Sequence, residues 1–226
     1  MYSERGSWLG GGTVVWSRTV PGTATTGLVL PDGCMDLIWN DGLLVAGPDT
    51  TGHATQETPG TRWTGVRFAP GTGPAVFGVP AHELRDRRVP LDALWPEREV
   101  RLLAERVAAA PDPGAVLETA AWRRERPDPL CAPLVAALRQ GLGVAAAADA
   151  AGLSQRQLRR RSLDAFGYGP KTLARVLRMR RALRLAETGT PFAEVAATAG
   201  YADQAHLARE VRALTGWTLS RLLERR

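Results

Sequence analysis

The last hundred residues of this chain contain an internal repeat, which restricts the fold more than any other feature of the sequence. Two glycines suited to turns, Gly152 and Gly200, lie 48 positions apart. Four further pairs of identical residues lie 49 positions apart: Leu158 and Leu207, Arg160 and Arg209, Gly167 and Gly216, and Leu173 and Leu222. Because a single insertion explains the difference, the spacing predicts two tandem copies of one helical unit.

Each copy has the pattern of a turn followed by a capped helix. Gly152 can adopt the left-handed conformation of a tight turn, and Ser154 with Gln157 forms a capping-box pair that starts a helix. In the second copy Asp203 can cap a helix that ends before Gly216. A helix, a glycine turn and a second short helix are typical of a helix-turn-helix, whose second helix enters the major groove of DNA.

The helical pattern continues through the whole C-terminal part. Predicted helices there cover 129–139, 144–151, 154–166, 171–186, 191–199 and 203–214. The longest of them, 171–186, has an apolar face and connects the two copies. Two recognition helices joined in this way could lie in successive major grooves, roughly 34 Å apart.

Basic residues concentrate in the same part of the chain. Residues 1–126 carry 13 basic and 15 acidic side chains, whereas 127–226 carry 16 and 8. Between 154 and 184, ten basic residues stand against the single Asp164. This density favours a polyanionic partner over an ordinary solvated face, so we expect the C-terminal part to bind double-stranded DNA.

The first half alternates short apolar runs with Gly, Pro, Asn and Asp, which is typical of strands joined by tight turns. Predicted strands cover Thr13–Ser17, Leu28–Leu30, Met35–Trp39, Leu43–Ala46 and Trp63–Phe68. Between and after them we expect a loop at Gly47–Gly60, short helical turns at 74–88, and helices at 96–110 and 115–126. The segment 127–129, Pro-Asp-Pro, is the clearest boundary, because a residue that precedes proline avoids helical backbone.

The sequence thus predicts an α+β protein of two domains. A β-rich regulatory or sensor domain with flanking helices, for which a cupin-like barrel is one candidate form, covers 1–95. A helical connector covers 96–127. An all-α DNA-binding domain of two helix-turn-helix units joined by a long helix covers 128–226.

Composition and motifs exclude several classes of protein. Cys34 and Cys131 provide neither a disulfide framework nor a cysteine-rich zinc site, and the spacing of His53 and His82 suggests no metal. The N-terminus lacks the apolar run of a signal peptide, and no stretch approaches about 20 apolar residues, which predicts a soluble cytoplasmic protein without a membrane partner. No nucleophile elbow, phosphate loop or paired His/Glu motif occurs, so we expect neither an enzyme nor a cofactor.

The second copy of the repeat resembles the signature segment of the AraC/XylS family of transcription regulators. The resemblance covers 199–211, Ala-Gly-Tyr-Ala-Asp-Gln-Ala-His-Leu-Ala-Arg-Glu-Val, and 214–218, Leu-Thr-Gly-Trp-Thr. The first copy is similar through 152–154, 158–160 and 167–171. A resemblance of this length is specific, unlike a lone short motif, and it implies two helix-turn-helix units that bind DNA.

Both copies also depart from the family pattern. Ser162 stands where the family usually has a large apolar residue, and Leu163 where a basic or polar residue is common. Either Leu163 turns inward or the core at this point is underfilled. In the second copy Val211 replaces an aromatic residue and Leu219 replaces a proline. We expect these changes to affect local stability more than DNA binding.

The resemblance implies base-edge contacts by six side chains of the two recognition helices: Arg156, Arg159, Arg160, Ala205, His206 and Arg209. We expect Gln204 to add a base contact, although a glutamine near a helix start can also cap or pack locally. Phosphate contacts, which position the protein without specifying sequence, are expected from three residues: Ser154, Lys171 and Arg212. Arg161 lies nearer the packed side, where it can pack beside Leu158 or pair with an acid.

The N-terminal half resembles, over shorter pieces, an uncharacterised sensor-like domain that precedes the AraC-type domain in many bacterial regulators. The similar pieces are 29–38, 45–48, 65–71 and 78–95, and they imply a β-rich regulatory module. Candidate effector-contacting residues are aromatic, polar and charged side chains of this half: Trp16, Cys34, Asp36, Trp39, Trp63 and Arg67. For the tryptophans, filling the core of a small sheet domain is the commoner explanation.

These observations predict a sequence-specific transcription regulator that responds to a small-molecule effector, with a homodimer and, for an activator, RNA polymerase as further partners. An architectural DNA-binding protein with an N-terminal oligomerisation domain is the alternative, and it would show steep salt dependence with little preference for any site. Alkyl transfer through Cys34 is disfavoured, because Asp32 and Asp36 would raise the pKa of a thiol that reacts as the thiolate.

Overall fold

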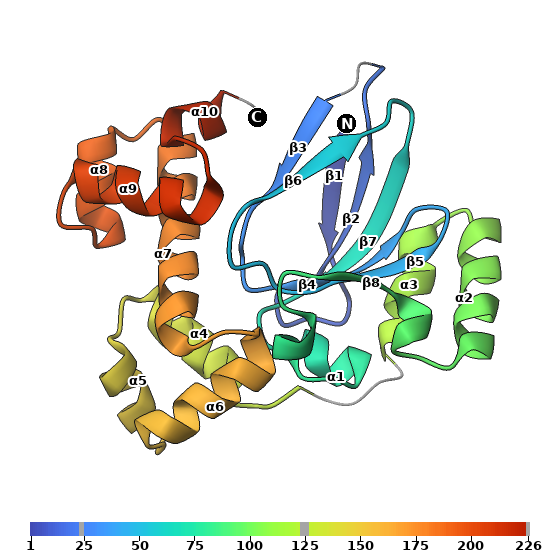
Figure 1. Cartoon of the computed structure of the whole chain (residues 1–226), viewed down its shortest axis with the longest axis horizontal. Helices are drawn as coiled ribbons and strands as arrows, with labels where there is room; N and C mark the ends of the chain where they lie inside the picture. Colours follow the sequence, from blue (N-terminus) through green and yellow to red (C-terminus); the bar gives the residue numbers. More distant parts are fainter. Residues whose placement is uncertain (23–24, 123–126, 225–226) are drawn as a thin grey trace.

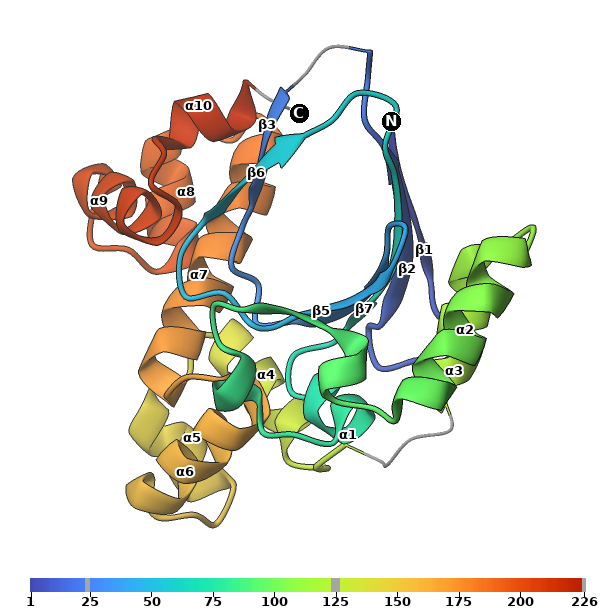
Figure 2. The ribbon, with the colours of Figure 1, turned by 45° about the vertical axis from the view of Figure 1, so that its right-hand side comes forward.

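The computed structural model describes residues 1–22, 25–122 and 127–224, which divide into a β-rich half and an all-helical half (Figure 1). The β-rich half contains an antiparallel six-stranded sheet in the order β1, β2, β7, β4, β5, β8. Its strands are β1 (Tyr2–Gly6), β2 (Val14–Thr19), β4 (Met35–Trp39), β5 (Leu43–Ala46), β7 (Arg62–Phe68) and β8 (Arg88–Pro90). A second sheet pairs β3 (Thr25–Val29) with β6 (His53–Glu57) and faces the concave side of the first (Figure 2).

The strand register separates an apolar face of the large sheet from a polar one. Because successive side chains of a strand point to opposite faces, residues that pair across strands share a face. One row of paired residues is apolar and buried: Val15, Val66, Leu37, Val45 and Val89. The neighbouring row, on the opposite face, contains Val14, Arg67, Asp36, Ala46 and Arg88. The apolar row is therefore the centre of the domain core, and the polar row lies on the concave side.

Two helices cover the apolar face of the sheet (Figure 2). α2 (Glu97–Ala109) and α3 (Pro113–Trp122) contribute Leu103 and Leu117 to the same buried cluster as the strands. Contact with the sheet is close, since a Cβ added at Gly114 of α3 would lie 2.5 Å from a methyl carbon of Val15. The residues predicted as a connector thus contribute to the core of the β-rich half, and the division of the chain at residue 95 stays a prediction.

Three short helical elements close the end of the sheet that meets the all-helical half (Figure 1). They are α1 (Gly73–Phe77), η1 (Ala81–Leu84) and η2 (Leu91–Ala93). Both α1 and η1 contact the helical half, so this end of the sheet is where the two halves meet.

The all-helical half contains two helix-turn-helix units arranged around one long helix (Figure 1). Its helices are α4 (Cys131–Arg139), α5 (Val144–Ala150), α6 (Gln155–Phe166), α7 (Pro170–Glu187), α8 (Phe192–Ala199), α9 (Gln204–Thr215) and α10 (Leu219–Leu223). Helix α7 buries Leu173, Val176, Met179 and Leu183 among its neighbours and so forms the shared core of both units. None of the helices that the structure describes is long and apolar enough to cross a membrane.

The structure corrects several predicted boundaries. The predicted loop Gly47–Gly60 contains β6, and β1, β8 and α10 were not predicted. Strand β6 is polar and largely exposed, so backbone pairing with β3 holds it without an apolar pattern that a sequence could reveal. By contrast, β4 and β5 agree with their predicted ranges residue for residue. The predicted helix end at 123–126 lies outside the described residues.

Candidate nucleic-acid interface

The first recognition helix, α6, is capped at both ends. Gly152 adopts the predicted left-handed turn conformation, with φ of 64°. The amide of Gln157 donates to the Ser154 hydroxyl at 3.3 Å, and the Ser154 amide donates to Gln157 Oε1 at 2.9 Å. Gly167 ends the helix in the left-handed conformation, while Leu158 anchors it in the core. The predicted capping box is therefore confirmed.

Three arginines project from the exposed side of α6: Arg156, Arg159 and Arg160. Within residues 1–22, 25–122 and 127–224, none of the three forms an ion pair. Arg161 differs, because its Nη1 lies 3.4 Å from Asp128 Oδ2, which is the second of the two placements expected for it. The three unpaired guanidinium groups can make bidentate contacts with guanine or phosphate.

The second recognition helix, α9, has a matching start and end. Asp203 Oδ1 accepts a hydrogen bond from the His206 amide at 2.6 Å, and Gly216 ends the helix in the left-handed conformation. Leu207 is fully buried on the core side. The candidate base contacts Gln204, Ala205 and Arg209 are exposed on the other side, and His206 is half-buried between them.

The ring of His206 is oriented by its neighbours. Its Nδ1 accepts a hydrogen bond from the Ala202 amide at 3.3 Å, and the ring packs edge-to-face on Tyr201 with centroids 5.3 Å apart. Because Nδ1 acts as an acceptor, the neutral ring carries its proton on Nε2. His206 can therefore donate to a base acceptor, such as guanine N7 or O6, and cannot accept there.

Both recognition helices direct their C-terminal ends toward the β-rich half. Gly167, after α6, packs against Pro48, and the carbonyl of Leu214 in α9 accepts a hydrogen bond from the Gly52 amide at 2.7 Å. The N-terminal halves, which carry the exposed candidates, thus lie on the side away from the sheets (Figures 1 and 2). The N-terminal residues of a recognition helix are the ones that contact base edges.

A basic groove of about 370 Å³ lies against α7 between the two units, and sequence reasoning missed it. Five cationic side chains line it: Arg139, Lys171, Arg175, Arg178 and Arg181. Lys171 was expected to bind phosphate, but the others were not. Four of them are spaced by four, three and three positions in the sequence: Lys171, Arg175, Arg178 and Arg181. This spacing places them on one face of a helix, and it could have predicted the groove.

The charges beside this groove are poorly compensated. Burial lowers the pKa of Arg184, and repulsion from Arg180, Arg139 and Arg181 lowers it further, while Glu187 opposes the change. Within the described part of the chain, neither Arg139 nor Arg181 forms an ion pair. Repulsion of this kind favours binding of an anion, because an added negative charge would relieve it.

Two interactions fix α9 to α7 at the other side of the groove. Arg175 Nε and Nη2 donate to Glu210 at 2.8 and 3.1 Å, and these hydrogen bonds lower the pKa of Glu210. The guanidinium of Arg178 lies over the Tyr201 ring, 4.7 Å from its centroid. The second unit is therefore oriented on the long helix by charged contacts as well as by its core.

The remaining two phosphate candidates are placed differently. The Ser154 hydroxyl both accepts from the Gln157 amide and lies 2.9 Å from Gln157 Oε1, so the capping box already engages it. Arg212 is exposed near the C-terminal end of α9. Both stay candidates, with Ser154 limited to a secondary contact.

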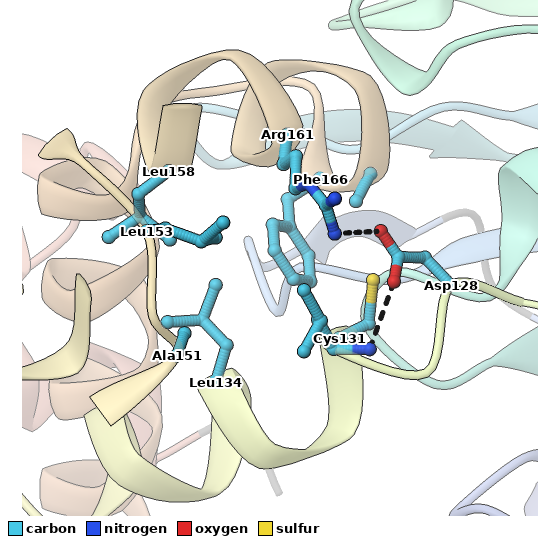
Figure 3. Close-up of a pocket in the computed structure, with 10 residues that line it drawn as sticks. Asp128, Cys131, Leu134, Ala151, Leu153, Leu158, Arg161 and Phe166 are labelled. Atoms are coloured by element: carbon cyan, nitrogen blue, oxygen red, sulfur yellow. Dashed lines mark hydrogen bonds and ion pairs between the residues drawn. The ribbon is translucent and has the colours of Figure 1, made fainter. Parts of the chain in front are cut away.

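Ser162, where the chain departs from the family pattern, places an unpaired hydroxyl in the core of the first unit as the structure describes it. Ser162 is fully buried and its hydroxyl has no hydrogen-bond partner among the described residues, while Leu163 is only half-buried. The same unit contains a cavity of about 20 Å³ beside Phe166, with Arg161 pointing to Asp128 at its rim (Figure 3). Ser162 is not among the residues that line this cavity, so the cavity does not follow from the serine. Its volume is close to what one water molecule needs, which is too small for an effector.

Four of the effector candidates converge on the concave face of the large sheet. The Trp16 indole N–H donates to Asp36 at 2.7 Å, and Arg67 Nε lies 3.3 Å from the same carboxylate. Arg67 also lies 3.5 Å from Asp32, and Cys34 is close enough for these charges to act on its thiol. Burial raises the pKa of Asp36 above its usual value, although Arg67 opposes the rise.

The two other tryptophan candidates lie on opposite faces. Trp63 is two residues from Gly65, which pairs with Trp16, so Trp63 shares the concave face. Trp39 pairs with Thr64 and packs against the core cluster on the helix-covered face. The structure therefore brings Trp63, and not Trp39, to the face that carries Asp36 and Arg67.

Two further groups on this side bear on the predictions. Burial, followed by Asp32, raises the pKa of the Cys34 thiol well above its usual value, in the direction expected for an unreactive thiol. Tyr168, in the turn between α6 and α7, is buried, and its hydroxyl has no hydrogen-bond partner among the described residues. Burial raises its pKa well above the usual value, and Asp32 raises it further.

Residues 147–225, from within α5 to the end of α10, match the family described as a helix-turn-helix domain, and residues 13–90 match the family described as a domain of unknown function. The chain carries an AraC-type helix-turn-helix domain. This domain supports a DNA-binding transcriptional regulator, a class of protein that is not enzymatic. No protein in a curated set of sequences matches the chain.

Solved structures of ToxT share the arrangement of the two halves. An unliganded ToxT variant from Vibrio cholerae has a TM-score of 0.50 at 10% identity, covering 94% of this chain and 97% of that one. ToxT of the same organism bound to a methylnaphthalenyl butenoic acid gives the same TM-score, identity and coverage. A probable AraC family transcriptional regulator from Rhodopseudomonas palustris has a TM-score of 0.38 at 21% identity, covering 43% of this chain and 97% of that one. The ToxT likeness shows that a β-rich half followed by the AraC-type domain is a shared fold.

Proposed function

We propose that this regulator binds a specific DNA sequence by placing α6 and α9 in two successive major grooves. The observation that carries the proposal is the matched arrangement of the two helices, each with a polar N-cap, an exposed N-terminal half and a C-terminal end against the β-rich half. The proposed base contacts are Arg156, Arg159, Arg160, Gln204, Ala205, His206 and Arg209.

The basic groove on α7 supplies the proposed contact between the two major grooves. A protein that spans two turns of DNA on one side passes the phosphate backbone between them. Lys171, Arg139 and Arg181 line the groove at that position and have no acidic partner in the described chain. We assign them, with Ser154 and Arg212, to phosphate binding, which adds affinity without sequence preference.

Three single substitutions test this assignment. Arg160→Ala and Arg209→Ala should each relax base preference at one position by ~1–3 kcal/mol, because a bidentate base contact is lost. Lys171→Ala should weaken binding evenly across sequences and reduce the salt slope by about one. Arg101→Ala, which removes an exposed charge from α2, is the matched control and should change neither quantity. Uniform loss from Arg160→Ala, Arg209→Ala and Lys171→Ala would instead indicate an architectural DNA-binding protein.

We further propose that a small-molecule effector binds at the concave face, where Trp16, Asp36 and Arg67 meet and Trp63 lies on the same side. A ligand-bound structure of ToxT, which shares the fold, supports this role for such a protein. Arg67 already faces two carboxylates, so the chemistry favours a ligand that donates hydrogen bonds over a simple anion. A compound that raises the Tm of the wild type should lose this effect with Trp63→Ala, and equal stabilisation of both proteins would contradict the assignment.

The homodimer and the contact with RNA polymerase belong to the same proposal. Sedimentation of the protein with and without its DNA site measures the first, and transcription with purified polymerase measures the second. A repressor would form the homodimer without contacting RNA polymerase.

A further inference from the structure

One short segment of the β-rich half touches both helix-turn-helix units. The segment 47–52 connects β5 to β6. At its start, Pro48 packs so closely on Gly167 that a Cβ added there would lie 2.5 Å from Pro48 Cγ. At its end, the Gly52 amide donates to the Leu214 carbonyl at 2.7 Å.

The two contacts fall at corresponding places in the internal repeat. Gly167 follows the last residue of α6, and Leu214 lies in the last turn of α9, two positions before Gly216. Gly167 and Gly216 are the 49-residue repeat partners that end the two recognition helices. The segment 47–52 therefore spans from the end of one recognition helix to the end of the other.

Hydrogen bonds hold this segment in one shape. Asp49 accepts two hydrogen bonds from Arg88, at 2.7 and 2.6 Å. The Thr50 amide and hydroxyl donate to Asp86 at 2.7 and 2.9 Å, and the Asp86 amide donates to the Pro48 carbonyl at 3.1 Å. Bidentate contacts between an arginine and a carboxylate are among the more rigid interactions in proteins. The segment is thus a stiff element and not a loose loop.

Residues 82–88 connect the first unit to the same part of the β-rich half. Arg85 Nη1 donates to the Gly167 carbonyl at 3.4 Å, and His82 Nδ1 lies 3.4 Å from Asp164 of α6. Because 82–88 also holds the segment 47–52, the two recognition helices are joined twice, once through α7 and once through the β-rich half. Two connections restrict the distance and angle between the helices more than α7 alone could, since long helices bend.

We propose that the segment 47–52 is a specificity-determining brace that fixes the spacing of the two DNA segments this regulator recognises. The inference rests on the proposed function, because it concerns the sites that α6 and α9 bind. A brace of fixed length predicts that the protein discriminates between sites that differ only in the number of base pairs between the two segments. The base contacts themselves are unaffected by it.

Gly52→Ala tests the brace without touching a DNA-facing residue. A Cβ at Gly52 would lie 2.6 Å from the Thr215 carbonyl oxygen and 3.1 Å from its Cα, so the backbone at the end of α9 must move. Gly6→Ala in β1 is the matched control, because a Cβ there meets nothing within 4 Å. Neither glycine has a positive φ, so the two substitutions differ in the space available to the new Cβ and not in backbone strain.

The measurement is the affinity of the full-length protein for duplexes with the selected spacing and with one base pair more or fewer. Wild type and Gly6→Ala should prefer the selected spacing, and Gly52→Ala should reduce this preference on the order of tenfold while keeping the base preference of each segment. Thr50→Val removes the hydrogen bond from the Thr50 hydroxyl to Asp86 and adds no bulk at the contact with α9. It should reduce the spacing preference by less than Gly52→Ala does.

The failures of the two proposals are distinguishable. A wild-type protein that selects no DNA sequence contradicts the proposed function. A wild-type spacing preference that Gly52→Ala and Thr50→Val both leave unchanged, with both variants folded by circular dichroism, overturns the brace alone. If Gly52→Ala does not fold, the result with Thr50→Val decides.

Discussion

The two helix-turn-helix units share one plan but are supported in different ways. The first unit is fixed to the β-rich half, because Phe166 and Cys131 pack on Gly71 and α6 lies against η1. The second unit is fixed mainly to α7, through the Arg175–Glu210 ion pair. Among the described residues, one backbone hydrogen bond joins this unit to the β-rich half, from the Gly52 amide to the Leu214 carbonyl, together with close packing at Gly52.

The difference suggests a division of roles. The unit with three unpaired arginines and broad packing on the β-rich half is the electrostatic anchor, whereas the unit held through an ion pair and one segment is the easier one to move. A change in the β-rich half would then act mostly on α9. The following substitutions test this comparison, beginning with the largest expected effect.

Phe166→Ala should remove about 3–5 kcal/mol from the free energy of unfolding, because it empties a fully buried site. Phe166 also lies between the halves, so its loss should lower the stability of the β-rich half as well. Leu207→Ala, at a fully buried site of the second unit, is the comparison and should leave the β-rich half unchanged. Urea unfolding followed by near-UV circular dichroism, together with amide exchange, distinguishes the effects of the two variants. An equal loss of stability in the β-rich half from both variants would contradict the comparison.

Glu210→Gln should cost about 1 kcal/mol near neutral pH, a value kept small because Arg175 is partly exposed. Arg175 lowers the pKa of Glu210 in the folded state, so the stabilisation is present above the unfolded pKa of about 4.3 and is lost as pH falls through the lowered folded value. The difference in Tm between wild type and variant should therefore shrink below pH 4.3 or so. A difference that stays constant with pH would show that the ion pair does not support the second unit.

Ser162→Ala should have the smallest effect and the opposite sign. Its hydroxyl is buried without a hydrogen-bond partner in the described chain, so removing it should raise the free energy of unfolding by up to about 1 kcal/mol. DNA affinity should not change, since Ser162 faces the core. A loss of stability in urea unfolding would mean that an ordered water already satisfies the hydroxyl.

The parts of the molecule that local chemistry determines could be predicted from the sequence. The capping box of Ser154 and Gln157, the cap at Asp203 and the glycine turns depend on residues three to five positions apart, and all are present as expected. For Arg161 either packing beside Leu158 or pairing with an acid was expected, and it pairs with Asp128. The repeat itself made the tandem units predictable.

Features that depend on distant residues could not be predicted in the same way. Strand β6 is polar on its exposed side and is held by pairing with β3, so it left no pattern. The opposite faces of Trp39 and Trp63 follow from the pairing of both strands, which alternation within one strand does not reveal. The contact between Gly52 and Leu214 joins residues of the two halves, and the sequence around each of them contains no pattern that predicts it.

Selection of bound duplexes from a random DNA library, with the full-length protein at physiological salt, tests the central claim most directly. The account predicts two sequence-specific segments centred about 10–10.5 base pairs apart, one altered by Arg160→Ala and the other by Arg209→Ala. No enriched sequence, or a single segment that both substitutions alter alike, would contradict it.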